Sequence, residues 1–351
     1  MTIEIAGLKF ITSEKFLTSI VFSNSIKFLS TIQTRDKLAP SRLKEENILT
    51  AKILDGKFFS QLIKDEAKSK ISELRSRNVE PALAVILVGN DPASQVYVRN
   101  KHKSCQELGI KSIEIELPES TTKEELLEKI DELNADSAVH GILVQLPLPR
   151  NIKQHEDEIL NRIDPLKDVD GFHPMNVGQL VIGQPRLIPC TPAGCIKMLE
   201  LADIPIDGTR AVIIGRSNIV GKPMFHLLMS KHATVTVCHS HTKNLAEITK
   251  QADILVAAMG RAKFVTADMV KPGATVIDVG INRVDRTQDE IEKLKSEGKN
   301  PKPTKLVGDV DFENVKEVAG AITPVPGGIG LLTVAMLMQN VVRACELQLS
   351  K

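Results

Sequence analysis

The sequence of 351 residues contains no tryptophan, one tyrosine and only five cysteines. Aromatic side chains supply the stacking platforms on which single-stranded nucleic acids bind, so their scarcity argues against such a partner. A charge excess is also lacking, because 45 lysines and arginines balance 44 acids and leave a net charge of +1. Binding to nucleic acids or acidic membranes needs a basic surface. We therefore expect neither a nucleic-acid partner nor a membrane partner.

The five cysteines are too few and too scattered for a disulfide scaffold, and their odd number fits a reducing compartment. Cys190 and Cys195 lack the two-residue spacing of a zinc knuckle. Cys238, His239 and His241 form another possible cluster, but no second ligand pair follows them. We therefore expect no metal site. No apolar run reaches the ~20 residues that span a bilayer.

The first 45 residues differ from the remainder of the chain. Between Lys15 and Arg35 no acidic residue occurs, and apolar residues mix with serine, threonine and lysine. Such a composition is typical of an amphipathic organelle-import peptide, although Glu4 and Glu14 interrupt its start. We predict that residues 1–45 are an N-terminal extension that directs the protein to the mitochondrial matrix, with the cytoplasm as the alternative.

Strand and helix patterns alternate from about residue 48 onward. Asp91 and Pro92 supply a cap and a first-turn proline for a helix that ends before Gly109. The elements expected in this half are helices over 54–77, 92–108 and 122–134 and strands over 81–89, 111–117 and 139–146. A proline-rich stretch from Pro147 to Pro192 is expected to form loops at a cleft between two domains.

A second alternating series follows. The expected strands span 209–214, 233–238, 254–258 and 275–279, and the expected helices span 221–230, 245–251 and 330–349. The charged segment 285–304 is helix-like in its middle, and we interpret it as a solvated excursion without chemistry. Alternating strands and helices indicate parallel sheets. The sequence therefore predicts two doubly wound α/β domains, the second one Rossmann-like, with a cleft between them.

The segment from Val212 to Pro223 combines a predicted strand, a Gly-containing turn and a helix start. Backbone amides at such a helix N-terminus bind a pyrophosphate. The spacing departs from Gly-x-Gly-x-x-Gly, because Ser217 stands at the second glycine and Gly221 comes one residue late. An ordinary tight turn is the alternative, but the strand–turn–helix context favours a dinucleotide.

The following strand indicates which dinucleotide binds. An NAD-selective site usually places an acid about 20 residues after the Gly turn, where it bonds the ribose 2′-hydroxyl. The segment from Cys238 to Lys243 contains no acid. Its hydroxyls and lysine, together with the upstream Arg216, instead supply the donors and positive charge that a 2′-phosphate needs. We therefore predict NADP as the cofactor.

Four polar side chains are expected at one edge of the first sheet. Tyr97 and Lys101 are four residues apart and so lie on one face of their helix. Gln145 ends a strand of the same sheet, and a carboxylate, that of Asp168 or Asp170, lies in a loop that follows. Ligands bind parallel sheets at the carboxyl ends of the strands. The four residues therefore form a candidate site, although each one alone also fits a structural role.

Seven ordered blocks of sequence resemble the methylenetetrahydrofolate dehydrogenase/methenyltetrahydrofolate cyclohydrolase family. Two of them are Gly-Ile-Leu-Val-Gln-Leu-Pro-Leu-Pro at 141–149 and Thr-Pro-Val-Pro-Gly-Gly at 323–328. The others span 87–101, 167–172, 189–192, 215–221 and 277–282. The resemblance implies that the protein oxidises 5,10-methylenetetrahydrofolate to the methenyl form with NADP and hydrolyses that product to 10-formyltetrahydrofolate. It also implies a homodimer without a metal requirement.

The resemblance further implies a role for each matching residue. Lys101 would be the general base or proton shuttle for water attack on the methenyl carbon, and Gln145 would hold and tune that lysine. Tyr97 would stack on the folate, and Asp170 would bond its pterin ring. The other substrate-binding residues implied are Val144, Leu146, Pro326, Gly327 and Gly328. The cofactor-binding residues implied are Gly215, Arg216, Ser217, Ile219, Val220, Gly221, His239, Ser240, Thr242, Gly280 and Ile281.

The domain boundaries also follow from the resemblance. A folate-binding catalytic domain is expected over 46–190, completed by the C-terminal helix 328–351, and an NADP-binding domain over 191–327. The sequence departs from the family pattern at Leu331, where a proline is usual, and at Ala193, where animal relatives commonly have lysine. We expect the change at Leu331 to affect substrate affinity or loop order and to leave the fold intact.

Two alternatives stay open. A different NADP oxidoreductase, of the shikimate- or amino-acid-dehydrogenase type, would explain the nucleotide half but not the set of Tyr97, Lys101 and Gln145. A catalytically weakened binding or regulatory paralogue would fit Leu331 and the unusual N-terminus. The sequence lacks a large C-terminal extension for a formate-ligase activity, so we expect no third reaction.

Overall fold

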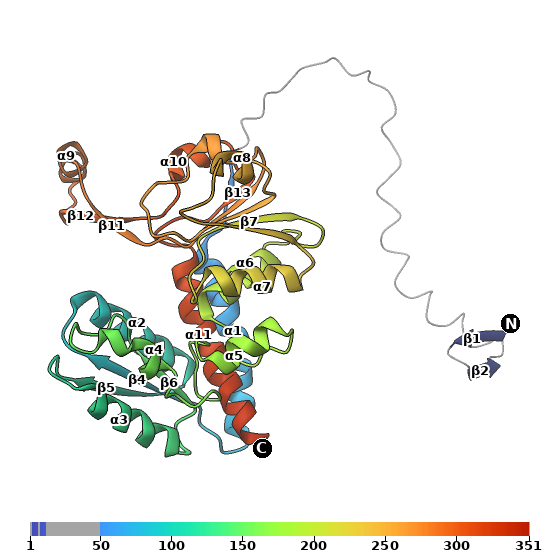
Figure 1. Cartoon of the computed structure of the whole chain (residues 1–351), viewed down its shortest axis with the longest axis vertical. Helices are drawn as coiled ribbons and strands as arrows, with labels where there is room; N and C mark the ends of the chain where they lie inside the picture. Colours follow the sequence, from blue (N-terminus) through green and yellow to red (C-terminus); the bar gives the residue numbers. More distant parts are fainter. Residues whose placement is uncertain (1, 6–7, 12–49, 351) are drawn as a thin grey trace, which may run out of the picture. The chain divides into compact units, whose positions relative to one another are not determined.

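The computed structural model describes residues 2–5, 8–11 and 50–350, and the chain divides into two units at residues 47 and 48. The first unit contains the antiparallel pair of β1 (Thr2–Ile5) and β2 (Leu8–Ile11). Most of the predicted import peptide lies outside the described residues. The second unit carries all other elements (Figure 1).

The first sheet of the second unit has three parallel strands in the order β5-β4-β6. They are β4 (Ala82–Val88), β5 (Lys111–Leu117) and β6 (Gly141–Val144), joined through helices α2 (Pro92–Leu108) and α3 (Lys123–Ala135). Every residue of the central strand β4 is buried, as expected from its continuous apolar run. The predicted caps of α2 are confirmed: the Asp91 side chain accepts a 2.7 Å hydrogen bond from Ser94 N, and Gly109 ends the helix at φ +77°.

The second sheet has six parallel strands in the order β3-β13-β10-β9-β7-β8. The strands are β3 (Lys52–Ile53), β7 (Arg210–Ile214), β8 (Thr234–Cys238), β9 (Ile254–Ala257), β10 (Thr275–Asp278) and β13 (Ala321–Ile322). Helices α7 (Gly221–Ser230) and α8 (Leu245–Thr249) connect strands of this sheet. The four predicted strands and two predicted helices are confirmed, and both sheets have the expected doubly wound α/β character. The short strands β3, at the edge of the sheet, and β13, beside it, were not predicted.

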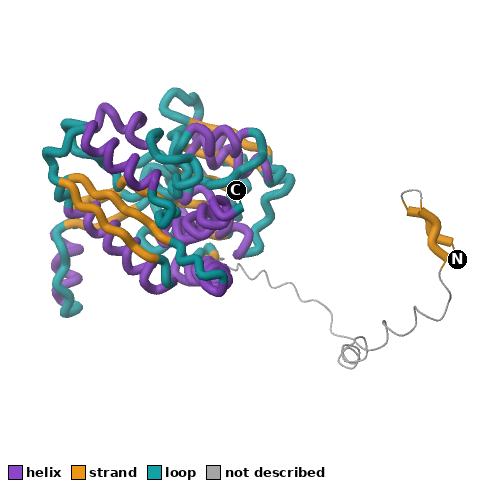
Figure 2. The backbone as a smooth tube through the Cα atoms, turned by 90° about the horizontal axis from the view of Figure 1, so that it is seen from below, coloured by secondary structure: helices purple, strands orange, loops and turns teal. Residues whose placement is uncertain are grey.

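Three long helices join the two sheets. Helix α11 (Ile329–Leu349) packs along α1 (Gly56–Ser76) and against α6 (Cys190–Leu201), as Figure 1 shows. In Figure 2 the C-terminal end of the chain, which follows α11, lies among helices drawn in purple. Helix α11 is long and apolar enough to cross a membrane by length and composition, but 56% of its most apolar window is buried inside the protein. We therefore describe it as a core helix.

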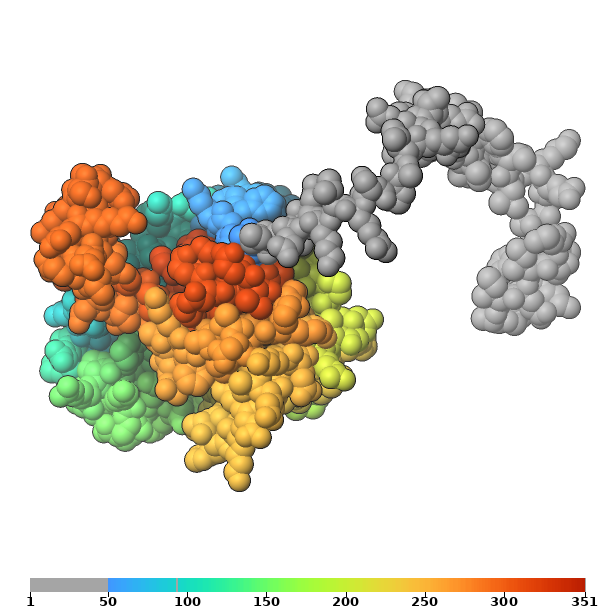
Figure 3. Space-filling view, turned by 90° about the horizontal axis from the view of Figure 1, so that it is seen from above, coloured from blue at the N-terminus to red at the C-terminus, as the bar shows by residue number. Residues whose placement is uncertain are grey.

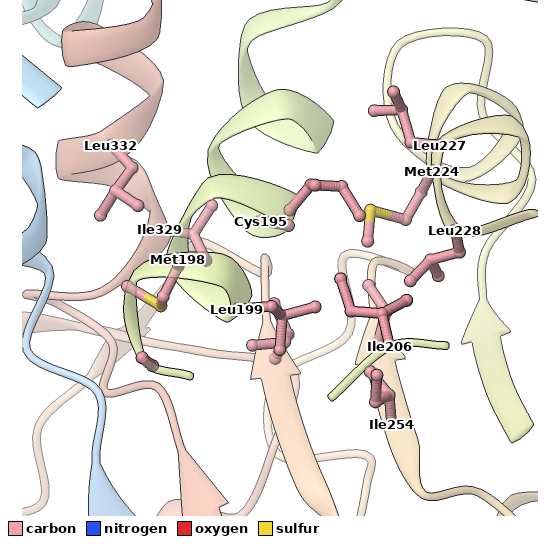
Figure 4. Close-up of a cluster of buried hydrophobic side chains, with 14 of the residues drawn as sticks. Cys195, Met198, Leu199, Ile206, Met224, Leu227, Leu228, Ile254, Ile329 and Leu332 are labelled. Carbon is pink, nitrogen blue, oxygen red and sulfur yellow. The ribbon is translucent and has the colours of Figure 1, made fainter. Parts of the chain in front are cut away.

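The start of α11 anchors the larger hydrophobic core. Figure 4 shows Ile329 and Leu332 of α11 beside Cys195 and Met198 of α6. The two helices approach closely because Gly194 has no side chain; a Cβ there would lie 3.1 Å from Leu332 Cβ. This contact fixes α11 at the point where the chain leaves the second sheet.

One expectation about the loops was wrong. The proline-rich stretch contains α4 (Glu156–Leu160), α5 (Pro174–Val181) and the start of α6, because a proline is tolerated in the first turn of a helix. The excursion contains the expected helix, α9 (Gln288–Ser296), and two strands that were not predicted flank it and pair with each other. Those strands are β11 (Asn282–Asp285) and β12 (Thr304–Val307). The remaining short elements are α10 (Phe312–Val315), η1 (Lys153–His155) and η2 (Ala267–Met269).

The predicted domain boundaries at 190/191 and 327/328 stay a prediction. One element bears on them: β3 precedes the first sheet in the chain but pairs with β13 in the second. The chain therefore contributes to the second sheet before it builds the first.

We predict that Leu332→Ala destabilises the protein by about 3 kcal/mol, because removing a fully buried leucine leaves a cavity that its neighbours cannot fill. Urea denaturation measures the change in the free energy of unfolding. The adjacent Leu331, with 43% of its surface exposed, provides the matched control, and Leu331→Ala should cost no more than about 0.5 kcal/mol. Equal losses in the two variants would contradict this packing account.

Candidate active site

The central contact of the candidate site joins α2 to the end of β6. Lys101 Nζ donates a 2.9 Å hydrogen bond to Gln145 Oε1, and Gln145 Nε2 donates a 2.7 Å bond to the carbonyl of Leu146. The second bond fixes the amide so that its oxygen faces the lysine. The structure therefore brings together two of the predicted residues and gives Gln145 the orientation needed to hold an amine.

The parallel sheet places both partners. Three residues separate the end of β4 from the start of α2, and β6 lies beside β4 with Val144 opposite Ile86. Gln145 continues that pairing, because its backbone N donates a 2.8 Å bond to the carbonyl of Ile86. Both side chains thus emerge at the carboxyl ends of neighbouring strands, where parallel sheets bind ligands.

The two carboxylates after β6 have different surroundings. Asp168 is buried and accepts hydrogen bonds from Gly171 N, His173 N and Asn176 Nδ2 at 2.8–3.1 Å, so it shapes its own loop. Asp170 is half-buried and interacts electrostatically with Lys101. The structure therefore leaves Asp170, the predicted pterin ligand, facing the lysine, while Asp168 stabilises the loop.

Burial and charge shift the ionisation of both groups. Burial lowers the pKa of Lys101, and the negative charge of Asp170 opposes that effect only in part. Burial likewise raises the pKa of Asp170 to about 6, although the positive charge of Lys101 pulls it down and Asp168 pushes it up. A lysine with a lowered pKa carries a larger fraction of neutral amine near pH 7, which is the form that can accept a proton.

A cavity of about 440 Å³ lies on the neighbouring face of α2. Tyr97 lines it together with loops that follow β10 and β13, and the predicted residues among its lining are Tyr97, Gly280, Ile281, Pro326, Gly327 and Gly328. Lys101, Gln145 and Asp170 are not among its lining residues. Tyr97 lies one turn before Lys101 on α2, so a residue on the lysine's face of the helix also lines the cavity.

The departure at Leu331 falls on this cavity. Leu331 lies in the first turn of α11, its backbone N donates a 3.1 Å bond to the carbonyl of Gly328, and its side chain lines the cavity. The first turn of α11 therefore forms without the proline that is usual in the family, and the substitution changes the side chain that lines the cavity.

The turn after β7 has the close geometry of a dinucleotide-binding turn. Gly215 has φ +133°, and a Cβ there would lie 2.2 Å from the carbonyl oxygen of Ala258. A Cβ on Gly221 would lie 2.3 Å from the carbonyl oxygen of Gly215. Ser217 Oγ accepts bonds from the backbone N of Val220 and of Gly221 at 3.2–3.3 Å. The turn thus requires both glycines, and the serine hydroxyl binds two backbone amides at the point where the turn enters α7.

The ends of β7 and β8 bring Arg216 and Ser240, the residues predicted to bind the 2′-phosphate, to corresponding positions on neighbouring strands. Ile214 pairs with Cys238, so Arg216 and Ser240 each lie two residues beyond a register partner. Gly215 N also donates to the carbonyl of Cys238 at 2.9 Å, which ties the two turns together. Arg216 and Ser240 are both exposed. The turns supply a cation, a hydroxyl and no carboxylate, and these groups fit NADP.

A four-residue turn presents Ser240. His239 N donates a 2.8 Å bond to Thr242 Oγ1, and Thr242 N donates a 2.9 Å bond back to the carbonyl of His239. Among the other predicted residues, Val144 and Leu146 flank Gln145 beside the lysine contact. Ile219, in the turn after β7, exposes 44% of its surface. The predicted residues thus fall into three neighbouring groups: the lysine contact, the cavity and the nucleotide turns.

Two buried carboxylates that sequence analysis missed hold the loops of the cavity. Asp278 accepts bonds from the backbone N of Gly280, Asp309 and Val310, each at 2.9 Å. Asp309 in turn accepts from the backbone N of Met259 and of Gly260 at 2.7–2.8 Å. Burial raises the pKa of Asp278 to about 7, and the three amide donors oppose this. Asp278 had been noted only as part of a family block and Asp309 not at all, because nothing local marks a carboxylate whose partners are distant loops.

The sequence predicted no metal site, and the side chains that bear on this prediction are those of histidine, cysteine, aspartate and glutamate. Within residues 2–5, 8–11 and 50–350, no group of three or more His, Cys, Asp or Glu side chains is placed to hold a metal ion. Of the three residues noted in the sequence, Cys238 is buried, and the rings of His239 and His241 have their centroids 5.8 Å apart.

Two family models match the chain. The catalytic domain of tetrahydrofolate dehydrogenase/cyclohydrolase matches residues 54–170, and the NAD(P)-binding domain of the same family matches residues 189–349. Together they span most of the second unit.

Curated and solved relatives cover the same part of the chain. The bifunctional protein FolD of Halalkalibacterium halodurans is 54% identical over 298 residues, which are 85% of this chain and 100% of that protein. The crystal structure of the FolD methylenetetrahydrofolate dehydrogenase/cyclohydrolase from Campylobacter jejuni has a TM-score of 0.76 at 48% identity and covers 84% of this chain and 99% of its own.

A third relative was solved with a cofactor. The methylenetetrahydrofolate dehydrogenase-cyclohydrolase of Trypanosoma brucei, complexed with NADP and an inhibitor, has a TM-score of 0.78 at 36% identity. That match covers 86% of this chain and 99% of the other chain.

Proposed function

Because the chain belongs to the tetrahydrofolate dehydrogenase/cyclohydrolase family, we propose that Lys101 performs proton transfer in the second of its two reactions. The enzyme oxidises 5,10-methylenetetrahydrofolate to 5,10-methenyltetrahydrofolate with NADP and hydrolyses that product to 10-formyltetrahydrofolate. The observation that carries the proposal is the 2.9 Å contact between Lys101 Nζ and Gln145 Oε1 at a half-buried position.

The first reaction depends on alignment. NADP, when bound, would supply the acceptor for the hydride that leaves the methylene carbon of the folate. The folate is left as a methenyl cation, whose charge its two flanking nitrogens share. No acid or base is needed, so the protein contributes mainly by holding the reacting atoms in place. Tyr97 would stack on the folate, while Gly280 and Ile281 form the opposite wall of the cavity.

The second reaction depends on Lys101. Water adds to the methenyl carbon and must lose a proton, and the neutral amine of Lys101 would accept it. The carbon–nitrogen bond then opens to give the formyl group, and the amine returns the proton to the leaving nitrogen. The lowered pKa of Lys101 favours the neutral amine at the start of each cycle. Gln145 would keep the amine directed at the reacting carbon, and Asp170 would bond the pterin ring.

The cofactor would be held by the two turns of the second sheet. The helix start at Gly221 would receive the pyrophosphate, and Arg216 and Ser240 would hold the 2′-phosphate. The remaining residues proposed for this site are Ser217, Ile219, Val220, His239 and Thr242.

Neither alternative function is retained. The matches to both domains of one family exclude a shikimate- or amino-acid-type dehydrogenase. Relatives more than 50% identical are bifunctional enzymes, which excludes a binding paralogue without activity.

We predict that Lys101→Met slows hydrolysis of methenyltetrahydrofolate by a factor of about 10²–10⁴, because the proton acceptor is removed while helix α2 keeps its shape. The dehydrogenase reaction should keep its rate within about tenfold, because it needs no base. Absorbance of the methenyl form follows both reactions in the purified enzyme.

Lys68→Met on α1 is the matched control, because Lys68 is exposed and lies outside the site. It should leave both rates unchanged. In the wild type, hydrolysis should accelerate as the pH rises through the pKa of Lys101. Hydrolysis at the wild-type rate in Lys101→Met would contradict the assignment.

We further propose that residues 1–45 direct the protein to mitochondria. The support is the acid-free stretch between Lys15 and Arg35. The curated relatives named above are bacterial and match about 85% of the chain. A fluorescent protein carrying residues 1–45 should co-localise with mitochondria under the microscope, whereas a diffuse cytoplasmic signal would contradict the proposal.

We also propose that the enzyme is a homodimer, as the family resemblance implies. Exposed apolar side chains at α5, namely Met175, Val181 and Ile182, support an interface between copies. Sedimentation velocity should give twice the chain mass of 38.5 kDa, and a species of one chain mass at micromolar concentration would contradict a dimer.

A further inference from the structure

The excursion formed by β11, α9 and β12 stands apart from the second sheet. Its two strands pair only with each other among the described residues, with Arg283 opposite Leu306. In Figure 1 the excursion projects beyond the six-stranded sheet above α2, and Figure 3 shows it, in orange, as a protrusion at one end of the body. Residues 282–307, here called the basic hairpin, were interpreted from sequence as solvated and without chemistry.

A cleft of about 1090 Å³ separates the basic hairpin from the start of α2. The cations among its lining residues are Arg283, Arg286, Lys299, Lys302 and Lys305. Asp91 is the single acid among them, and it accepts a hydrogen bond from Ser94 N as the cap of α2. The wall of the cleft therefore carries a strong excess of positive charge, in a protein whose net charge is only +1.

Three of these cations form no ion pair in the part of the chain that the structure describes. Lys305 pairs with Glu290, and Lys299 pairs with Glu297 at 2.7 Å. Arg283, Arg286 and Lys302 form no ion pair with any described residue. Arg286 and Arg283 donate hydrogen bonds to neutral groups, the carbonyl of Lys302 at 3.1 Å and Thr304 Oγ1 at 3.3 Å, and Arg286 also interacts electrostatically with Glu290. Each can therefore still bind an anion.

The cleft is continuous with the cavity of the candidate active site. The residues that line both are Tyr97, Asn100, Ile281, Leu306 and Pro326. Tyr97, Ile281 and Leu306 expose 42%, 49% and 37% of their surfaces, so an apolar neck joins the two. A ligand with an apolar middle and an anionic end fits this sequence of surfaces: cavity, neck and basic cleft.

Tetrahydrofolate has this construction. Its pterin is joined through an aromatic benzoyl group to glutamate, and further glutamates can be added in γ-linkage, each with one more carboxylate. We propose that the basic hairpin binds the glutamate tail of the folate substrate and makes the enzyme prefer polyglutamylated folates. This inference rests on the proposed function, because it assumes that the pterin end lies in the cavity beside Lys101.

The cofactor's phosphates are the other anions in the reaction, and their predicted residues lie elsewhere. Arg216, Ser217 and Ser240 end strands β7 and β8 at one edge of the six-stranded sheet, and none of them lines the cleft. The cleft cations are therefore available to the substrate.

The test compares methylenetetrahydrofolate carrying one glutamate with the form carrying five, in the full-length enzyme at low ionic strength. The wild type should show a KM roughly tenfold lower for the pentaglutamate, because several exposed charge pairs each contribute a little. The difference should shrink as salt is added, because salt screens exposed charges.

Arg283→Gln/Lys302→Gln removes two unpaired cations from the cleft. We expect the KM ratio between the two substrates to fall towards one, with kcat and the KM for the monoglutamate changed less than about twofold. Lys293→Gln/Lys295→Gln is the matched control, because it removes the same charge from α9 at residues that do not line the cleft. The control should keep the wild-type ratio, and the KM for NADP should stay unchanged in both variants.

Five outcomes would overturn the inference. Equal KM values for the two folates in an active wild-type enzyme would do so, as would a wild-type ratio in the cleft variant or a ratio lost equally in the control. A rise in the KM for NADP alone would assign the cations to the cofactor. A wild-type chain inactive on both folates would contradict the proposed function itself, and the inference with it.

Discussion

Lys101 is held at a half-buried position by an amide on one side and a carboxylate nearby on the other. Removing an ammonium group from water costs free energy, so the surroundings favour the neutral amine, while Gln145 and Asp170 keep the side chain in place. Other parts of the first sheet position the contact between Lys101 and Gln145. The parallel pairing of β4 with β6 brings α2 and Gln145 to one edge, and Asp168 fixes the loop that carries Asp170.

The second sheet supplies the opposite wall by a different means. Its cavity loops are joined by two buried carboxylates, Asp278 and Asp309, which bind backbone amides from several strand ends. The start of α11 completes the wall and packs into the core through Leu332. Hydride transfer needs alignment between a folate on one side and a nicotinamide on the other. A rigid carboxylate–amide network suits that demand better than flexible loops would.

Much of this could be predicted from the sequence, and the exceptions have physical causes. Strand β4 and helix α2 carry local signals, a continuous apolar run and a capping pair, and both were predicted almost to the residue. Helix α6 was missed because it is buried on most sides, so its sequence has no polar face, and its prolines lie at its start. Strand β3 has only two residues, and its pairing with β13 is a contact between distant parts of the chain.

In the site, too, residues with local sequence signals could be predicted, whereas contacts between distant parts of the chain could not. Helical spacing paired Tyr97 with Lys101, and strand ends brought in Gln145, so the catalytic set could be assembled locally. The basic cleft could not, because its charge excess arises only when β11 and β12 fold towards α2. The central claim is that burial lowers the pKa of Lys101. Nuclear magnetic resonance of lysine carbons, with Lys101 assigned through Lys101→Arg, measures that pKa directly. The account predicts a midpoint clearly below the ordinary value of 10.5, and a midpoint at or above 10.5 would contradict it.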